Sequence, residues 1–154
     1  MKVKLVIDFL ADDSYEIIKY LVEYKKYNEL DLEIHGYDTE NKGTINQAYY
    51  GLYYSAKYGV SLTYTERVLK AHFVENKDIG NLEVLASCYE DIGFNRHDLI
   101  DAMMDGDYVD MFEYLQASLS KEGINSRCYA YIFTDKKELY VGKDEIIQAI
   151  KDNK

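Results

Sequence analysis

The sequence predicts a single α/β domain, residues 1–154, in which a βαβ unit and a ββα unit flank a long helical block. Three observations predict this order. Two strand-like runs enclose a helical pattern near the start, helical spacing dominates residues 44–122, and a strand hairpin precedes a final helix. With 47% hydrophobic residues, 154 residues are enough for one core.

The first 43 residues predict the βαβ unit. Val3–Leu10, VKLVIDFL, is an apolar run rich in β-branched residues and predicts a buried strand. Apolar residues at helical spacing predict a helix from Ser14 to about Tyr27, with Asp13 and Glu16 forming a capping box at its start. Leu30–His35 alternates as a half-buried strand does. A right-handed crossover makes the two strands parallel.

The middle of the chain, from Thr44 to Glu122, is helical in pattern almost throughout. Four glycines divide it into short helices: Gly59, Gly80, Gly93 and Gly106. We therefore expect several short helices rather than further strands.

The end of the chain predicts the ββα unit. Cys128–Thr134 and Glu138–Val141 form a predicted hairpin, and Asp144–Asp152 a terminal amphipathic helix. A ββα unit after a βαβ unit is the thioredoxin arrangement. The thioredoxin-like part is then residues 1–43 and 123–154, around a helical insertion at 44–122.

Composition narrows the partners and the compartment. A net charge of −10 disfavours nucleic-acid backbones and anionic membranes. The N-terminal segment lacks a signal-peptide core, and no stretch approaches the length of a membrane span, so we expect a cytoplasmic protein. Its two cysteines, Cys88 and Cys128, are then expected to be reduced.

The chain has 17 tyrosines and no proline. The tyrosines cluster in Tyr15–Tyr27 and Tyr49–Tyr64. A tyrosine can bury its ring while its hydroxyl keeps a polar partner, so these helix faces can serve the core or a partner-binding surface. We favour compositional drift as the origin and leave the partner-binding face open.

The stretch Ala71–Phe94, AHFVENKDIGNLEVLASCYEDIGF, resembles the signature of FrnE-type DsbA-like proteins. Residues of the preceding helix and of the lead into the third strand resemble the same family: Asn46, Ala48, Ala56, Gly59 and Gly123-Ile124-Asn125. The resemblance spans nearly the whole chain in the right order. It implies a thioredoxin fold of the DsbA type and descent from thiol-disulfide oxidoreductases.

The chain departs from that family at the catalytic dithiol. Where the family has C-P-W-C, this sequence has Ala11-Asp12-Asp13-Ser14, followed by the matching Tyr15. Where the family has a cis-proline before its third strand, Arg127-Cys128 stands. The resemblance thus implies a degenerate active site at residues 11–14, in a groove lined by Tyr15, Arg127 and Cys128.

Dithiol exchange needs a thiolate at the helix N-terminus and a second thiol to resolve the mixed disulfide. Neither is present in residues 11–14. Asp12, Asp13 and Glu16 place carboxylates there instead, which stabilise a helix start by ~0.3–1 kcal/mol each and repel an incoming thiolate or glutathione. The missing thiols and the added carboxylates therefore both argue against dithiol exchange at this site.

Two side chains remain catalytic candidates, Ser14 and Cys128. The segment from Asp8 to Tyr15 resembles the D-F-x-S-P-Y-S-Y phrase of kappa-class glutathione transferases and hydroxychromene-carboxylate isomerases, with Ala11 at the activating serine and Ser14 at the second. Ser14 is otherwise an ordinary helix-start residue, which we favour.

Cys128 can form a mixed disulfide but has no partner to resolve it, and we favour a plain strand residue. If it faces the old active site, it should be partly reachable by solvent, whereas Cys88 should be a small core residue. Arg127 favours the Cys128 thiolate, and we expect Asp12 and Asp13 to outweigh it.

No metal or cofactor is expected. Asp8, Asp12, Asp13 and Glu16 could hold Mg²⁺ or Ca²⁺, but a solvated helix start plus one hydrogen-bonded aspartate is the reading we favour. The histidines lack metal-ligand spacing: His35, His72 and His97.

Three functions follow from these features. The first is a binding or adaptor module without dithiol activity, the second a single-cysteine or glutathione-dependent thiol enzyme, and the third an ordinary thiol-disulfide oxidoreductase. The missing dithiol weighs against the third and the Asp12-Asp13 pair against the second. The sequence identifies neither the partner nor the oligomeric state.

Overall fold

The computed structural model describes residues 1–153 and contains one four-stranded sheet in the order β2-β1-β3-β4. β1 (Lys2–Ile7) pairs in parallel with β2 (Asp31–Gly36) and antiparallel with β3 (Cys128–Phe133). β4 (Lys137–Val141) completes the sheet antiparallel to β3. All four predicted strands therefore lie in one sheet, as the sequence predicted.

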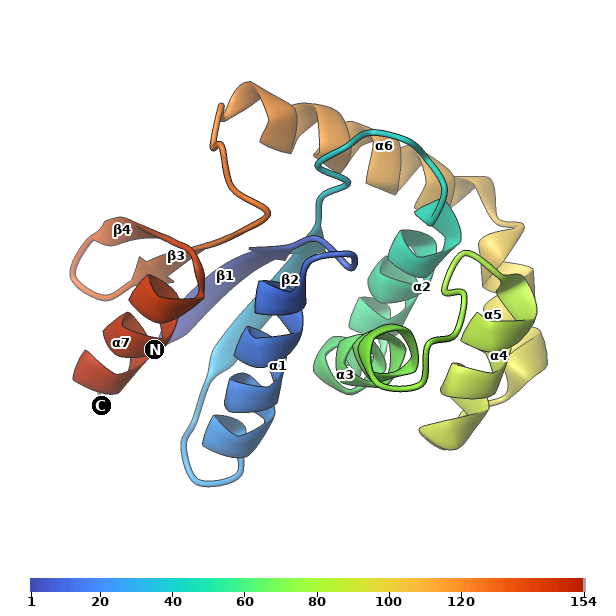
Figure 1. Ribbon diagram of the computed structural model, residues 1–154, viewed down its shortest axis with the longest axis horizontal. Coiled ribbons are helices and arrows are strands. Elements are labelled where there is room, and N and C mark those ends of the chain that lie inside the picture. The colour runs from blue at the N-terminus through green and yellow to red at the C-terminus, as the bar shows by residue number, and fades with distance from the viewer. Residues whose placement is uncertain (154) are drawn as a thin grey trace.

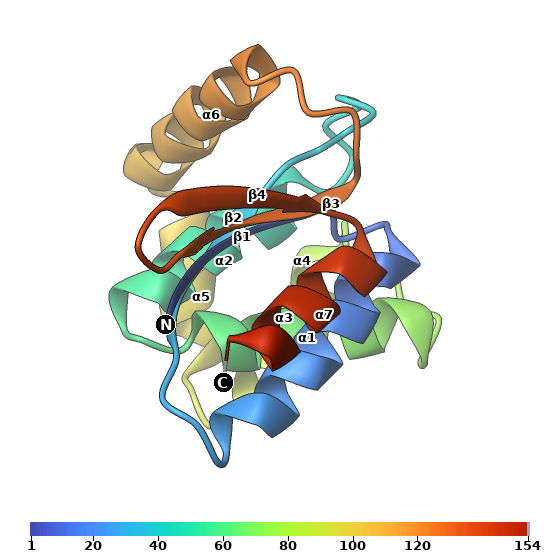
Figure 2. The ribbon, with the colours of Figure 1, turned by 90° about the vertical axis from the view of Figure 1, so that its left-hand side faces the viewer.

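Helices cover the two faces of the sheet unequally. α1 (Asp12–Lys25) and α7 (Lys143–Asp152) lie together on one face, and α6 (Gly106–Lys121) lies across the other (Figure 2). Val3, Leu5 and Ile7 of β1 are fully buried beneath the first pair. The opposite face is covered only in part, because α6 buries just Phe112 and Leu119.

The predicted helical block is confirmed. Beside the sheet lie α2 (Asn46–Lys57), α3 (Ser61–Phe73), α4 (Leu82–Asp91) and α5 (Arg96–Met103), before α6 leads to β3 (Figure 1). α3 packs on α1 and α2 packs on β2, so the block is fastened to the sheet edge.

Buried tyrosines join the helical block to the sheet and its own helices to one another. The Tyr49 hydroxyl accepts a hydrogen bond from the Phe9 N–H at 3.2 Å, and the Tyr53 hydroxyl accepts one from the Gly36 N–H at 3.1 Å. Tyr64 donates to the Ala48 carbonyl at 2.9 Å. These tyrosines fill the core with their rings and satisfy backbone groups with their hydroxyls.

Two predicted boundaries at the start of α1 are wrong. β1 ends at Ile7 rather than Leu10, because the chain turns at Asp8, whose carboxylate accepts the Leu10 N–H at 2.8 Å. α1 begins at Asp12, with Ala11 as an N-cap that makes no side-chain hydrogen bond. The predicted capping box is absent because Asp13 already lies inside the helix.

Candidate functional site

A hollow of about 550 Å³ opens where α1 begins and β3 starts. We call it the α1 groove. It is lined by Leu10, Ala11, Asp12, Asp13, Phe73, Ser126, Arg127 and Cys128. The fold thus brings residues 11–13 together with residues 127 and 128, which lie far away in the sequence.

Leu10, Phe73 and Ser126 also line the α1 groove and were not predicted from the sequence. Phe73 lies in the stretch that resembles DsbA-like proteins, which was the available signal. Tyr15, expected to line the groove, instead stacks on Phe73 with ring centroids 6.0 Å apart. Tyr15 therefore contacts a lining residue without lining the groove itself.

Cys128 borders the α1 groove but is only 2% exposed, so the expected partial accessibility is wrong. The pKa of the Cys128 thiol is raised from 9.0 to about 12, chiefly by burial and also by the carboxylates of Asp13 and Asp8. A hydrogen bond with Ser14 lowers that pKa and is outweighed. The thiol is therefore protonated at physiological pH.

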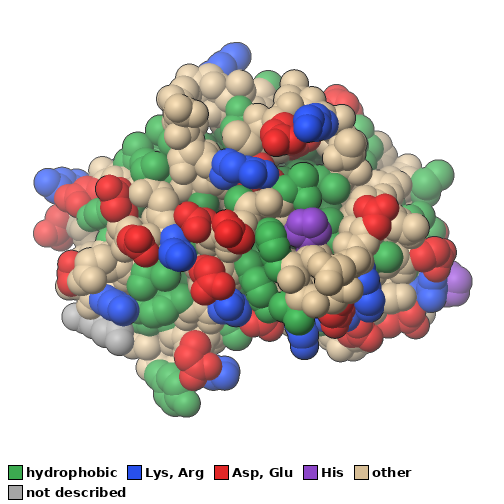
Figure 3. Space-filling model, viewed as in Figure 1, with side chains coloured by type: hydrophobic (Ala, Val, Ile, Leu, Met, Phe, Trp, Pro, Cys, Tyr) green, Lys and Arg blue, Asp and Glu red, His purple; other side chains and the backbone are tan. Residues whose placement is uncertain are grey.

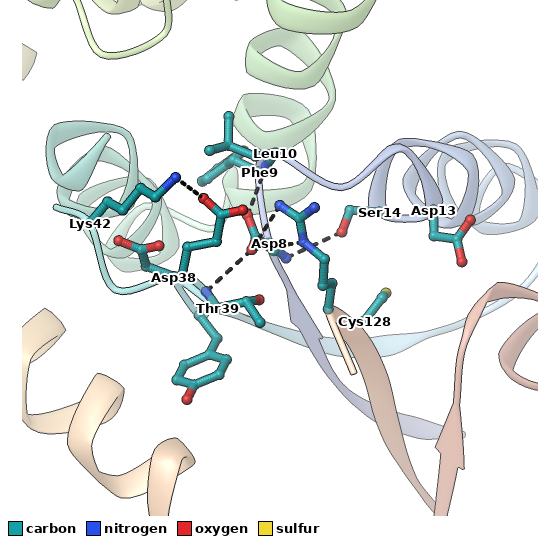
Figure 4. A network of polar contacts seen from close by, with 12 residues as sticks. Asp8, Phe9, Leu10, Asp13, Ser14, Asp38, Thr39, Lys42 and Cys128 are labelled. Atoms are coloured by element: carbon teal, nitrogen blue, oxygen red, sulfur yellow. Dashed lines mark hydrogen bonds and ion pairs between the residues drawn. The ribbon is translucent and has the colours of Figure 1, made fainter. Parts of the chain in front are cut away.

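Ser14 is completely buried and does not line the α1 groove. Its hydroxyl oxygen accepts a hydrogen bond from the Asp8 N–H at 3.2 Å, and its side chain also contacts Cys128 (Figure 4). Ser14 thereby ties the first turn of α1 to the end of β1. A hydroxyl held in this way is not free to activate a ligand in the groove.

Asp8 is the centre of the polar network beneath the α1 groove (Figure 4). Its carboxylate is 2% exposed and accepts backbone N–H bonds from Leu10 at 2.8 Å and Thr39 at 3.2 Å. The Tyr49 hydroxyl lies 3.5 Å from the same carboxylate. A buried carboxylate needs such partners, and this one joins three separate chain segments.

Arg127 completes the network. Both its Nε and its Nη2 donate to Asp8 Oδ2 at 3.3 Å, and its side chain is 42% exposed. From the sequence, Arg127 is expected to favour the Cys128 thiolate. That expectation is wrong, because the guanidinium is directed to Asp8 and the carboxylates set the electrostatics of Cys128.

Cys88 lies in α4 and is 1% exposed, which confirms its prediction as a core residue. Burial is also the first cause of its raised pKa. Both cysteines are free and buried.

The chain is similar to known proteins in its fold. No protein-family model and no curated protein matches the chain. Among solved structures, a 2-hydroxychromene-2-carboxylate isomerase matches with a TM-score of 0.84 at 13% identity, over 99% of this chain and 94% of that one. The cytosolic disulfide reductase DsbM from Pseudomonas aeruginosa matches with a TM-score of 0.74 at 14% identity, over 99% and 98%.

DsbA from Pseudomonas aeruginosa matches with a TM-score of 0.70 at 13% identity, over 97% of this chain and 81% of that one. The chain has a DsbA-like thioredoxin fold. At these identities the likeness establishes the fold, and the chemistry has to be argued from the residues of this chain.

The chain with this DsbA-like fold carries a net charge of −10. Figure 3 shows acidic side chains spread over one face of the molecule, with lysines and arginines between them. Across residues 1–153, no three histidine, cysteine or carboxylate side chains gather as metal ligands would. No helix within the same residues is long and apolar enough to cross a membrane.

Proposed function

We propose that this DsbA-like protein is a binding or adaptor module that has no dithiol redox activity and uses the α1 groove to hold a partner. One observation carries the proposal. The groove is open at about 550 Å³, yet the one thiol on its wall is buried with a pKa of about 12. The cavity is available to a ligand, whereas the sulfur chemistry is not.

The groove lining suggests the chemistry of that partner. Leu10, Ala11 and Phe73 supply an apolar wall. Asp12 and Asp13 supply carboxylates at its edge, in the first turn of α1. An apolar group next to a cationic one would satisfy both, as in a lysine-containing protein segment.

The alternative is a single-cysteine or glutathione-dependent enzyme, favoured by the likeness to a 2-hydroxychromene-2-carboxylate isomerase and to DsbM. Its candidate residues argue against it. Ser14 is buried behind the groove, and Cys128 is protonated. Asp12 and Asp13 also repel the carboxylates and the thiolate of glutathione. We also place the protein in the cytoplasm, in keeping with its two free thiols.

The test is a pull-down from native cytoplasm with the immobilised chain, with and without reductant. We expect the same partner in both, lost with Asp12→Arg and retained with Asp144→Arg. These variants are matched, because each reverses an exposed acidic residue in the first turn of a helix. Capture only without reductant, through a disulfide to Cys128, would overturn the proposal.

A further inference from the structure

A second hollow, of about 480 Å³, runs along the outer edge of β2 and shares no lining residue with the α1 groove. We call it the edge groove. Apolar side chains from four elements line it: Leu32, Ile34, Tyr53, Leu62, Met111 and Leu115. Its volume lies within the range of ligand pockets, ~300–1,000 Å³.

The edge of β2 offers unpaired backbone groups to this hollow. The Asp31 N–H donates to the Met1 carbonyl, and the Tyr37 N–H donates to the Ile7 carbonyl, so the odd-numbered residues of β2 face β1. The backbone N–H and C=O groups of the even-numbered residues then point away from β1, because the direction of these groups alternates along a strand.

Gly36 confirms this alternation, since its N–H donates to the Tyr53 hydroxyl at 3.1 Å on the outer side. Tyr53 therefore closes one end of the edge. The outward N–H and C=O groups of Leu32 and Ile34 make no such hydrogen bond within residues 1–153. Leu32 is half-buried and Ile34 is 4% exposed, so a fifth strand would reach Ile34 by entering the hollow that both residues line.

The charges along β2 select the occupant. Asp31 and Glu33 line the edge groove and point to the face of the sheet that carries α6, where Met111 and Leu115 also lie. Glu33 is already paired with Lys2 at 3.7 Å, so an incoming lysine meets the Asp31 carboxylate directly and competes with Lys2 for Glu33. The apolar surface beside them suits the long stem of a lysine. Lys25 is the one lysine among the described lining residues of the hollow.

On the other face, Leu32 and Leu62 offer apolar contacts. A strand added beside β2 places its side chains alternately on these two faces. A second copy of this chain is disfavoured, because its own acidic β2 would meet Asp31 and Glu33.

We propose that the edge groove binds an extended protein segment of alternating basic and apolar residues, which pairs with Leu32 and Ile34 as an added strand. His35 lines the same hollow, and its Nδ1 is buried without a hydrogen-bond partner among the described residues. A polar side chain of the bound segment would supply that partner.

The test uses a fluorescent Lys-Val-Lys-Val-Lys-Val peptide and ¹⁵N-labelled protein. We expect saturable binding that weakens with salt, with the largest amide shifts and slower hydrogen exchange at Leu32 and Ile34. A peptide of the same charge, N-methylated at alternate residues to remove its pairing N–H groups, should bind about tenfold more weakly or less. Equal binding of both peptides would overturn the proposal, because charge alone would then explain it.

The matched variants are Asp31→Lys/Glu33→Lys in the edge groove and Asp135→Lys/Glu138→Lys at the opposite edge of the sheet. The two doubles change net charge equally. We expect the first to weaken binding about tenfold or more and the second to leave it nearly unchanged. Equal losses, no binding by the wild type, or self-association through β2 would each overturn the proposal. Asp12→Arg should leave peptide binding intact, which separates this test from that of the α1 groove.

Discussion

Alkylation of Cys128 tests the account of the α1 groove quantitatively. Burial and nearby carboxylates raise the pKa of this thiol from 9.0 to about 12. At pH 8, a thiol with the ordinary pKa is about one-tenth thiolate, whereas a pKa of about 12 leaves about one part in ten thousand. Iodoacetamide should therefore label Cys128 about a thousandfold more slowly than a cysteine in a model peptide, and limited access slows it further.

The assay is a time course of labelling read by mass spectrometry of the tryptic peptides. Asp13→Asn should speed labelling of Cys128 only a few-fold, since burial is the first cause of the raised pKa. Cys88 should stay protected in both proteins, and urea should bring both thiols to the peptide rate. Labelling of native Cys128 within tenfold of the peptide rate would refute the reasoning.

Three further predictions concern stability and pH. Asp8→Asn should lower the free energy of unfolding in urea by about 2–4 kcal/mol, because a buried carboxylate with several donors is lost. Arg127→Gln should lower it by only about 1 kcal/mol, because that side chain is 42% exposed. Equal losses would contradict this account. Gly36→Ala should lower the free energy of unfolding by about 1–3 kcal/mol in the same assay, because a Cβ there would lie 2.0 Å from Tyr49 Cδ1. An unchanged midpoint would show that Tyr49 can move. Burial lowers the pKa of His35 below 6.5 in the folded protein. As the pH falls, the His35 side chain is therefore protonated in the unfolded chain before it is protonated in the folded protein. Stability should therefore rise with pH through the window below 6.5, and His35→Phe should flatten that rise in denaturation curves; NMR titration of His35 at or above 6.5 would refute it.

The strands and the helical block could be predicted because their patterns are local. Alternation in Leu30–His35 and the apolar run of β1 reflect burial on a sheet, and helical spacing persists from residue 44 to 122. The boundary of β1 could not be predicted in this way. Phe9 is apolar and buried like a strand residue, yet the Asp8 carboxylate has already turned the chain.

The environment of the α1 groove depended on contacts across long sequence separations. Nothing local indicates that Arg127 would be directed to Asp8, 119 residues away. The same holds for Tyr49, whose hydroxyl meets the Phe9 N–H across 40 residues. Of the two carboxylates predicted to act on Cys128, Asp13 raises its pKa and Asp12 is not among the causes. Burial, which is the first cause, was not predicted.

The tyrosine clusters show the same limit. Composition left them open as a partner-binding surface, whereas Tyr49, Tyr53 and Tyr64 are buried and bond backbone groups of neighbouring elements. A chain without proline or tryptophan uses these rings for both volume and hydrogen bonding. The edge groove, by contrast, is visible only once β2 is known to be an edge strand.

The central claim, that the fold persists without dithiol chemistry, is tested most directly by insulin reduction with dithiothreitol or glutathione as the electron source. We predict that the wild type gives the rate of the protein-free control and that Cys128→Ser gives the same rate, while a C-x-x-C oxidoreductase in parallel accelerates the reaction. Turnover by the wild type at the rate of that oxidoreductase, lost in Cys128→Ser, would contradict the claim and assign the chemistry to Cys128.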